Sequence, residues 1–205
     1  MRQFGLQTAR AVAVVDTSVG DAELDHLAAS GVRGIRFNLA QAGVTTVAMI
    51  PALSQRIAPR GWHIQINADA DLIVKNADLW ANLPCPVVFD HLAHVPEPEG
   101  RNHPVFPLML KLLATGKTWI KLSGAYADTK SGPPAYADSS IIARAYVQAA
   151  PAQLVWGSDW PHPTEAVTNK PDDALLFDLL ANWAPDEAVR NRILVDNPAR
   201  LYDFS

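Results

Sequence analysis

Short strand-like segments alternate along this 205-residue chain with segments that have the spacing of amphipathic helices, and this alternation limits the possible folds most strongly. Segments 11–15 (AVAVV) and 32–37 (VRGIRF), for example, end at Asp16 and Asn38. Such alternation requires a parallel sheet with helical crossovers, and continuously apolar strands fit a sheet covered on both faces. We predict strands at 11–15, 32–37, 62–66, 86–89, 118–122 and 153–156, and helices at 21–30, 46–58, 71–82, 105–115, 137–149, 172–182, 186–194 and 198–202.

Six strand–helix units fit either an open doubly wound sheet or part of an eight-stranded barrel. No strand is followed by a glycine-rich phosphate fingerprint, which argues against a nucleotide-binding sheet. No linker, composition shift or low-complexity segment divides the chain. We therefore predict one domain over residues 1–205.

The composition excludes several classes of partner. The net charge is -4 and no basic stripe is present, so we predict neither a nucleic-acid partner nor a membrane partner. The longest apolar run is far shorter than a membrane span, and the chain start lacks the apolar core of a signal peptide. Cys85 is the single cysteine, and we expect a buried, inert thiol. These features predict a cytoplasmic protein.

Polar residues stand where the predicted strands end. In a parallel barrel the carboxyl ends of the strands meet on one face, where barrel enzymes hold their catalytic groups. The residues at these ends are Asp16, Arg36, Asn38, Gln65, Asn67, Asp90, His91, Ser123 and Asp159. The pattern is typical of a barrel enzyme.

His91 and Asp159 are the strongest catalytic candidates. Histidine is the commonest acid, base or metal ligand near neutral pH, and a carboxylate can orient or deprotonate water. Together they indicate hydrolysis, with or without a metal. The structural alternatives are that His91 bonds a neighbouring carbonyl and that Asp159 caps a turn. By strand alternation Asp90 should point away from His91 and be structural. His94 could complete a metal-binding pair with His91 only if the turn between them were helical, and two nearby prolines favour an irregular loop instead.

Other polar residues are candidates for binding a substrate. Arg36 can grip a carboxylate through two hydrogen bonds, the alternative being an ion pair beneath the barrel rim. His162 can line the pocket, and Tyr126 belongs to a loop that can cover it. Lys121 lies mid-strand and needs a partner if it points inward. His63 lies at the opposite end of its strand, and we expect it to be structural.

The chain resembles the amidohydrolase superfamily, in the branch related to 2-pyrone-4,6-dicarboxylate lactonase. The resemblance covers nearly the whole chain. It rests on six motifs in register: 31–38 (GVRGIRFN), 61–65 (GWHIQ), 88–91 (VFDH), 121–124 (KLSG), 156–162 (WGSDWPH) and 197–202 (NPARLY). It implies a (β/α)8 barrel that hydrolyses lactones and related small carboxylated compounds.

The resemblance also implies individual roles. Asp159 matches an aspartate that activates water, His91 matches a histidine that polarises the substrate carbonyl or binds a metal, and Arg36 matches an arginine that holds a carboxylate. The expected cofactor is either none or one divalent metal such as zinc, with His91 and Asp159 as candidate ligands. The expected substrate-binding residues are Arg36, Asn38, Gln65, Asn67, Ser123, Tyr126 and His162.

Two departures from the family pattern change the expectation. The family begins with a His-x-His pair on its first strand, and this chain contains no His-x-His. By count 11–15 is the third strand, so we expect an N-terminally truncated, TIM-like (β/α)8 barrel with about six of the eight strand–helix units. Its open edges would require a partner, for example in a homo-oligomer. Ala42 and Ala127 replace further arginines of the pyrone lactonase pattern, which favours a less charged substrate such as a sugar lactone.

Three functions therefore remain as hypotheses. The leading one is a lactonase, a carboxylic ester hydrolase that opens a cyclic ester with water activated by Asp159, while His91 stabilises the oxyanion. The second is a metal-dependent decarboxylase or hydrolase of the same superfamily. The third is an inactive barrel fragment with at most a binding role.

Overall fold

A parallel β-sheet whose strands follow one another in sequence order forms the centre of the protein. The computed structural model describes residues 4–41 and 43–204. The strands are β1 (Ala11–Ala13), β2 (Val32–Asn38), β3 (His63–Asn67), β4 (Val87–Phe89), β5 (Thr118–Leu122) and β6 (Leu154–Trp156), and each neighbouring pair is parallel. The order lacks the reversal point of a doubly wound sheet, so the alternative of a partial barrel is confirmed.

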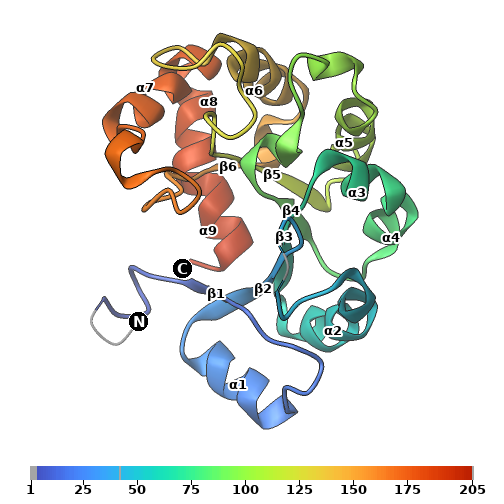
Figure 1. The fold of residues 1–205 in the computed structure, drawn as a ribbon. Helices are drawn as coiled ribbons and strands as arrows, with labels where there is room; N and C mark the ends of the chain where they lie inside the picture. The colour runs from blue at the N-terminus through green and yellow to red at the C-terminus, as the bar shows by residue number, and fades with distance from the viewer. Residues whose placement is uncertain (1–3, 42, 205) are drawn as a thin grey trace.

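Helices surround the curved sheet, most of them on its outer side, while the C-terminal helix α9 packs against its inner face (Figure 1). They are α1 (Asp21–Ala29), α2 (Ile50–Ile57), α3 (Ala70–Lys75), α4 (Ala77–Asn82), α5 (Val105–Leu113), α6 (Ala137–Ala149), α7 (Asp173–Trp183), α8 (Glu187–Asn191) and α9 (Asn197–Tyr202). Short 3-10 turns lie at Val47–Met49, Ala58–Arg60, His91–His94, Gly100–Asn102, Pro151–Gln153 and Val167–Asn169, and a π-helical turn at Arg192–Asp196 joins α8 to α9.

One predicted helix is divided in the structure. Segment 71–82 forms α3 and α4, which are separated at Asn76, where φ is -109°. The Asn76 side-chain amide donates to the Leu72 carbonyl over 2.8 Å, and Trp80 Nε1 donates to the Ile73 carbonyl over 2.8 Å. These side chains bond carbonyls near the end of α3, so the apolar period continues while the helix breaks.

Alternation along the strands creates two cores. Phe89 belongs to the large core beneath the outer helices, where its ring lies 5.7 Å from the ring of Trp80 on α4. Val88 and Val155 belong to a small inner core with Leu201 of α9. The apolar strands are therefore buried on both faces, as predicted, and inward-pointing residues at the strand ends meet above the inner core.

The sheet stays open between β1 and β6 within the described residues. There β1 pairs only with β2, and β6 pairs only with β5. The end of α9 lies beside β1 in Figure 1, and Arg10 Nε donates to the Tyr202 carbonyl over 3.1 Å. Arg33 on β2 also forms a 3.1 Å ion pair with the exposed Asp203, so polar contacts connect the C-terminal helix to the first strands.

Two structural findings bear on the expectations from composition. Cys85 is buried, as predicted, and burial raises the pKa of its thiol to about 11. In the described part of the chain, no helix combines the length and the apolarity that a membrane span requires.

Candidate active site

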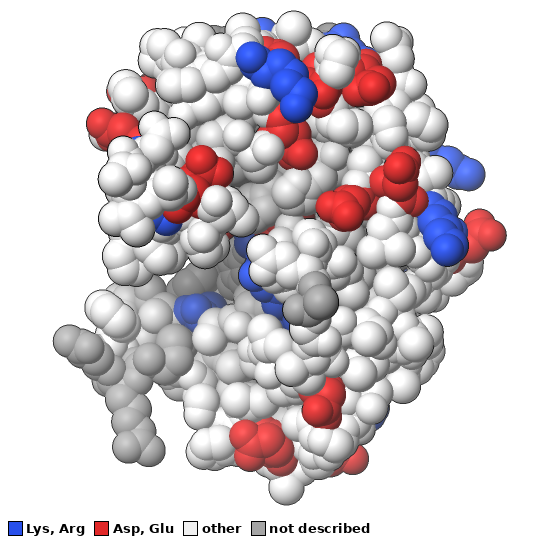
Figure 2. Space-filling view, in the orientation of Figure 1, with Lys and Arg blue, Asp and Glu red and all other residues white. Residues whose placement is uncertain are grey.

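A cavity of about 500 Å³ opens where the strands end. Figure 2 shows a hollow on this face with basic atoms at its floor. The cavity is lined by Arg10, Val12, Arg36, Gln65, Asp90, His91, Lys121, Ser123, Trp156, Gly157, Ser158, Asp159, Trp160 and Tyr202. Most of these residues lie at or near the carboxyl ends of strands, so the predicted convergence of strand ends is present.

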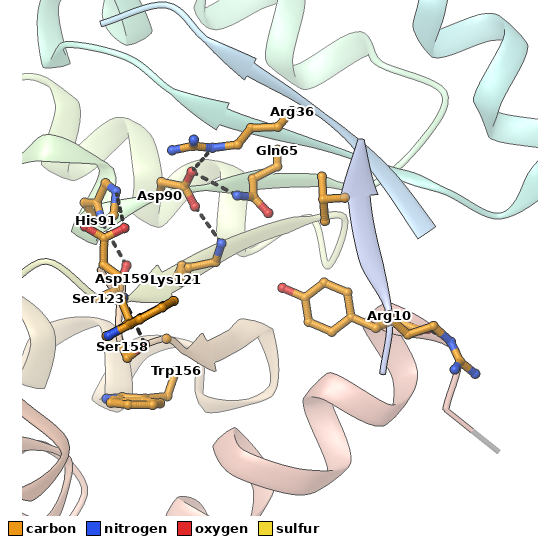
Figure 3. A pocket seen from close by; sticks show the side chains of 14 residues that line it. Arg10, Arg36, Gln65, Asp90, His91, Lys121, Ser123, Trp156, Ser158 and Asp159 are labelled. Carbon is orange, nitrogen blue, oxygen red and sulfur yellow. Dashed lines mark hydrogen bonds and ion pairs between the residues drawn. The ribbon is translucent and has the colours of Figure 1, made fainter. Parts of the chain in front are cut away.

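Asp90 lies at the centre of a charged cluster on the cavity floor (Figure 3). Its Oδ2 accepts from Arg36 Nε and Gln65 Nε2, each over 3.0 Å, and its Oδ1 pairs with Lys121 Nζ at 2.8 Å. Asp90 is only 1% exposed, and burial alone would raise the pKa of its carboxyl group. Lys121, His91 and Arg36 outweigh that effect and lower the pKa to about 2. Asp90 is therefore an anion that orders two cations beside the cavity.

The expectation that Asp90 points away from His91 and stays outside the site is wrong. Strand β4 ends at Phe89, and Val88 belongs to the inner core, so Asp90 points inward by the same alternation. His91 has a φ of 50°, in the left-handed region, where the alternation no longer applies. The backbone turn brings both side chains to the same cavity.

Arg36 is held from one side and remains open on the other. Its Nε donates to Asp90, and within the described chain its two terminal nitrogens have no hydrogen-bond partner. Its side chain is 31% exposed. The ion-pair alternative for Arg36 is therefore observed, and this pair at Nε leaves the terminal fork available to an anion. Lys121 has the inward partner that its position required.

His91 is fixed by contacts that the strand order creates. Its Nδ1 lies 2.9 Å from Ser123 Oγ, and its Nε2 lies 3.7 Å from Asp159 Oδ1. Gly124 has a φ of 61°, and a Cβ atom there would lie 2.6 Å from His91 Nδ1, so only glycine leaves room for this ring. Burial lowers the pKa of His91, although Asp90 and Asp159 oppose it, which favours the neutral imidazole at neutral pH.

The two carboxylate oxygens of Asp159 have different surroundings. Oδ2 accepts a 2.6 Å hydrogen bond from the Tyr126 hydroxyl, while Oδ1 faces His91 Nε2 at a distance too long for a direct hydrogen bond. His162 lies behind Tyr126, with its Nδ1 3.0 Å from the hydroxyl oxygen. Oδ1 and His91 Nε2 can therefore contact one oxygen atom of water or substrate between them.

The remaining predicted site residues divide into three groups. Gln65 and Ser123 line the cavity, whereas Tyr126 and His162 lie behind Asp159. Asn38 and Asn67 lie outside the cavity lining, where the amide of Asn67 donates to Asn38 Oδ1 over 2.9 Å. His94 contacts Asn67 Oδ1 at 2.8 Å through Nε2 and Asp128 Oδ2 at 3.0 Å through Nδ1. Burial would lower the pKa of His94, but Asp128 outweighs it and the pKa is raised.

Sequence reasoning missed several cavity residues. Arg10 precedes β1 and reaches the cavity from the open side of the sheet, and no local pattern marks it. Trp160 lies at the cavity and is 74% exposed. Strand alternation could have placed Lys121 in the cavity, because residues two apart point to the same face and Trp119 belongs to the inner core. Ala42 lies outside the described residues.

The described residues do not by themselves complete a zinc site. A catalytic zinc ion usually has three protein ligands from histidine, cysteine or acidic side chains. His91 Nε2 and Asp159 Oδ1 can supply two, and within residues 4–41 and 43–204 no group of three such side chains is arranged to hold a metal. We therefore derive no reaction step through a metal ion.

Comparisons with known proteins identify relatives of the whole chain. Residues 6–204 match the family described as amidohydrolase. The chain is 37% identical to a 2-pyrone-4,6-dicarbaxylate hydrolase of Comamonas testosteroni, over 95% of this chain and 67% of the relative. It is 30% identical to a D-galactarolactone isomerase of Agrobacterium fabrum, over 97% of this chain and 68% of the relative.

A solved structure shows the same fold. An apo crystal structure of an Agrobacterium tumefaciens protein superposes with a TM-score of 0.88 at 29% identity, over 97% of this chain and 70% of that chain. The chain thus spans about two thirds of the length of these relatives. The match over nearly all of its residues nevertheless decides the classification: the chain belongs to the amidohydrolase family.

Proposed function

We propose that this chain carries the catalytic face of a lactonase, an enzyme that opens a cyclic ester of a small carboxylated molecule. The observation that carries the proposal is the free Oδ1 of Asp159, which faces His91 Nε2 at 3.7 Å beside the open fork of Arg36. The comparisons support the lactone as the substrate class, because both relatives described above are named for lactone or pyrone compounds.

In the proposed reaction Asp159 is the general base. A water molecule held by Asp159 Oδ1 loses a proton to Asp159 as its oxygen attacks the lactone carbonyl, whose own oxygen contacts His91 Nε2. His91 and the ammonium of Lys121 stabilise the negative charge that develops on the carbonyl oxygen. The carbon–oxygen ester bond then breaks, and the proton on Asp159 passes to the departing alkoxide. The opened molecule has a hydroxyl group and a carboxylic acid, which releases its remaining proton to solvent and becomes a carboxylate.

The charges that line the cavity support an anionic substrate. Three cations, Arg10, Arg36 and Lys121, line it against two carboxylates, Asp90 and Asp159, in a chain whose net charge is -4. The Arg10 guanidinium donates to the carbonyls of Tyr202 and Asp203, so Arg36 and Lys121 are the cations that a substrate can contact. Because Asp90 already neutralises part of this charge, we propose a substrate with a single carboxylate rather than several. A hydroxylated sugar-acid lactone meets this description.

Replacing Arg36 with methionine should weaken the binding of a carboxylated lactone without weakening that of an uncharged lactone. We expect KM for a carboxylated lactone to rise about 10- to 100-fold, the equivalent of one lost charge-assisted contact, while KM for an uncharged lactone changes little. Steady-state kinetics on a panel of paired charged and neutral lactones provides the measurement. Arg33→Met is the matched control, because Arg33 lies on the same strand but pairs with Asp203 away from the cavity. An equal effect of Arg36→Met on both lactones would argue against the carboxylate contact.

A second candidate function is isomerisation of a lactone. The D-galactarolactone isomerase match, over 97% of this chain, favours it. The chemistry begins in the same way, except that a hydroxyl group of the substrate replaces water as the nucleophile. Turnover in water enriched in ¹⁸O separates the two functions by mass spectrometry. Hydrolysis adds one labelled oxygen to an opened product, whereas isomerisation yields an unlabelled lactone of unchanged mass.

The number of candidate zinc ligands in the cavity predicts how tightly the protein retains a metal ion. Since His91 and Asp159 are two ligands where zinc usually has three, we expect this chain to retain less than one zinc ion per molecule after dialysis against a chelator. Elemental analysis of the dialysed protein measures the ratio. One tightly retained zinc per chain, lost together with activity, would instead favour the metal-dependent hydrolase or decarboxylase.

A further inference from the structure

Three side chains form a line that leads from Asp159 away from the cavity. Tyr126 follows β5, His162 follows β6, and Asp173 is the first residue of α7. The Tyr126 hydroxyl lies 2.6 Å from Asp159 Oδ2 and 3.0 Å from His162 Nδ1, and His162 Nε2 lies 3.2 Å from Asp173 Oδ1. We call Tyr126, His162 and Asp173 the relay. The relay joins the segments that follow β5 and β6 to the start of α7, behind the carboxylate of Asp159.

The single hydroxyl hydrogen of Tyr126 determines which atom donates each hydrogen bond in the relay. A tyrosine hydroxyl has one hydrogen, and Asp159 Oδ2 is an acceptor, so that hydrogen is used in the 2.6 Å bond. The 3.0 Å contact between the Tyr126 oxygen and His162 Nδ1 can then form only if Nδ1 carries a hydrogen and donates it. His162 is therefore held in the tautomer protonated at Nδ1.

On the far side of His162, Nε2 forms no hydrogen bond within the described residues. His162 is 2% exposed, and its Nε2 faces Asp173, although this contact is not aligned as a hydrogen bond. Other polar neighbours do not compete for the ring, because the Lys170 ammonium and the Glu165 amide both donate to the His162 backbone carbonyl.

The relay acts on a residue with an uncommon backbone conformation. Asp159 has a φ of 63°, and such left-handed residues persist where the surroundings determine them strongly. The bond from Tyr126 occupies Oδ2 and rotates Oδ1 toward His91. Without this bond the carboxylate could turn either oxygen to the cavity or bond both to water.

We propose that the relay positions Asp159, with His162 donating from Nδ1 to Tyr126 and Tyr126 donating to Oδ2, so that Oδ1 alone faces the substrate. This inference rests on the proposed function for its kinetic consequence but not for the tautomer. The members of the relay are positioning residues, since they act through Asp159 and lie outside the cavity lining.

The tautomer is measured directly by ¹⁵N NMR of the histidine side chains in the whole chain. We expect His162 to be protonated at Nδ1 in the unaltered protein, and Tyr126→Phe to release this preference. His162→Asn identifies the resonance, since it removes it. A His162 that is protonated only at Nε2 would overturn the relay, whether or not the protein turns over any lactone. If the tautomer is as expected but no lactone reacts, the proposed function fails and the relay stands.

Kinetics of matched variants test the positioning role. We expect Tyr126→Phe to reduce kcat about 10- to 100-fold with KM nearly unchanged, as for other outer partners of catalytic groups. His162→Leu should have a similar effect, and His162→Asn should restore much of kcat because its amide can donate from the position of Nδ1. Tyr136→Phe is the control, since Tyr136 is a buried tyrosine with no bond to Asp159.

Two results would contradict this expectation. One is an unchanged kcat in Tyr126→Phe, and the other is equal loss in His162→Asn and His162→Leu while both remain folded by circular dichroism. Should His162→Leu fail to fold, Tyr126→Phe and the NMR measurement still decide the question.

Discussion

Replacing Asp159 with asparagine should reduce kcat for lactone opening by about 10²- to 10⁴-fold, the range that general base catalysis contributes. The amide oxygen can still accept the hydrogen bond from Tyr126, so the loop should keep its conformation. The amide nitrogen would then face His91 in place of Oδ1, and it cannot accept a proton from water. Steady-state kinetics measures the loss, and thermal melting followed by circular dichroism shows whether the fold is retained.

The control for this substitution is Asp178→Asn, an exposed acidic residue on α7 that takes no part in the site. It should leave kcat unchanged. If Asp159→Asn kept a kcat within twofold of the unaltered protein, Asp159 could not be the base, and the water would have to be activated elsewhere. Loss of the folded signal in this variant would mean that Asp159 has a structural role as well.

Replacing Asp90 with asparagine should have the largest effect on stability. It leaves Lys121 and Arg36 facing a neutral amide, and removing one partner of a buried ion pair typically costs about 3 to 5 kcal/mol. Both cations retain some exposure, so we expect about 3 kcal/mol less free energy of unfolding in denaturant titrations at neutral pH. KM for an anionic lactone should rise too, because Asp90 orients Arg36.

The effect of Asp90 should depend on pH in one direction. Its pKa in the folded protein is about 2, below the ordinary value of 3.8, so the stabilisation is fully present above the ordinary value. It is lost as the pH falls through about 2. The difference in unfolding free energy between the unaltered protein and Asp90→Asn should therefore shrink on acidification below pH 3.8.

A double variant provides the decisive comparison for Asp90. Adding Lys121→Met to Asp90→Asn removes the cation that the first substitution left unpaired, so we expect at least about 1 kcal/mol of stability to return. Strictly additive losses in the two single variants and the double variant would show that Asp90 and Lys121 do not interact energetically. The inner position of Lys121, close to Trp119, makes methionine a suitable replacement by volume.

Much of the architecture was predictable because it depends on local patterns. All six strands lie where apolar runs predicted them, although β1 ends two residues early at Ala13. The division of segment 71–82 was not predicted, because the bonds of Asn76 and Trp80 to nearby carbonyls change the backbone without changing the apolar period. The identification of His91 and Asp159 as neighbours followed from the rule that parallel strands end on one face.

The errors at the site have a common physical origin. Asp90 was assigned to the wrong side because the strand ends at Phe89 and the backbone enters the left-handed region at His91. Asn38 and Asn67 do end neighbouring strands, but they bond to each other and to His94 instead of lining the cavity. Arg10 enters the site from the open side of the sheet, which depends on how the C-terminal helix packs.

The sequence by itself determined the order of strands and helices, the parallel sheet and the residues available at its carboxyl edge, because the hydrophobic period and the handedness of crossovers act locally. Only the tertiary structure decided how those residues are paired. It placed Asp90 among Arg36, Gln65 and Lys121, and it gave the two oxygens of Asp159 different partners. Such pairings join positions that are far apart in the chain, and they depend on where each strand stops and how the backbone turns there.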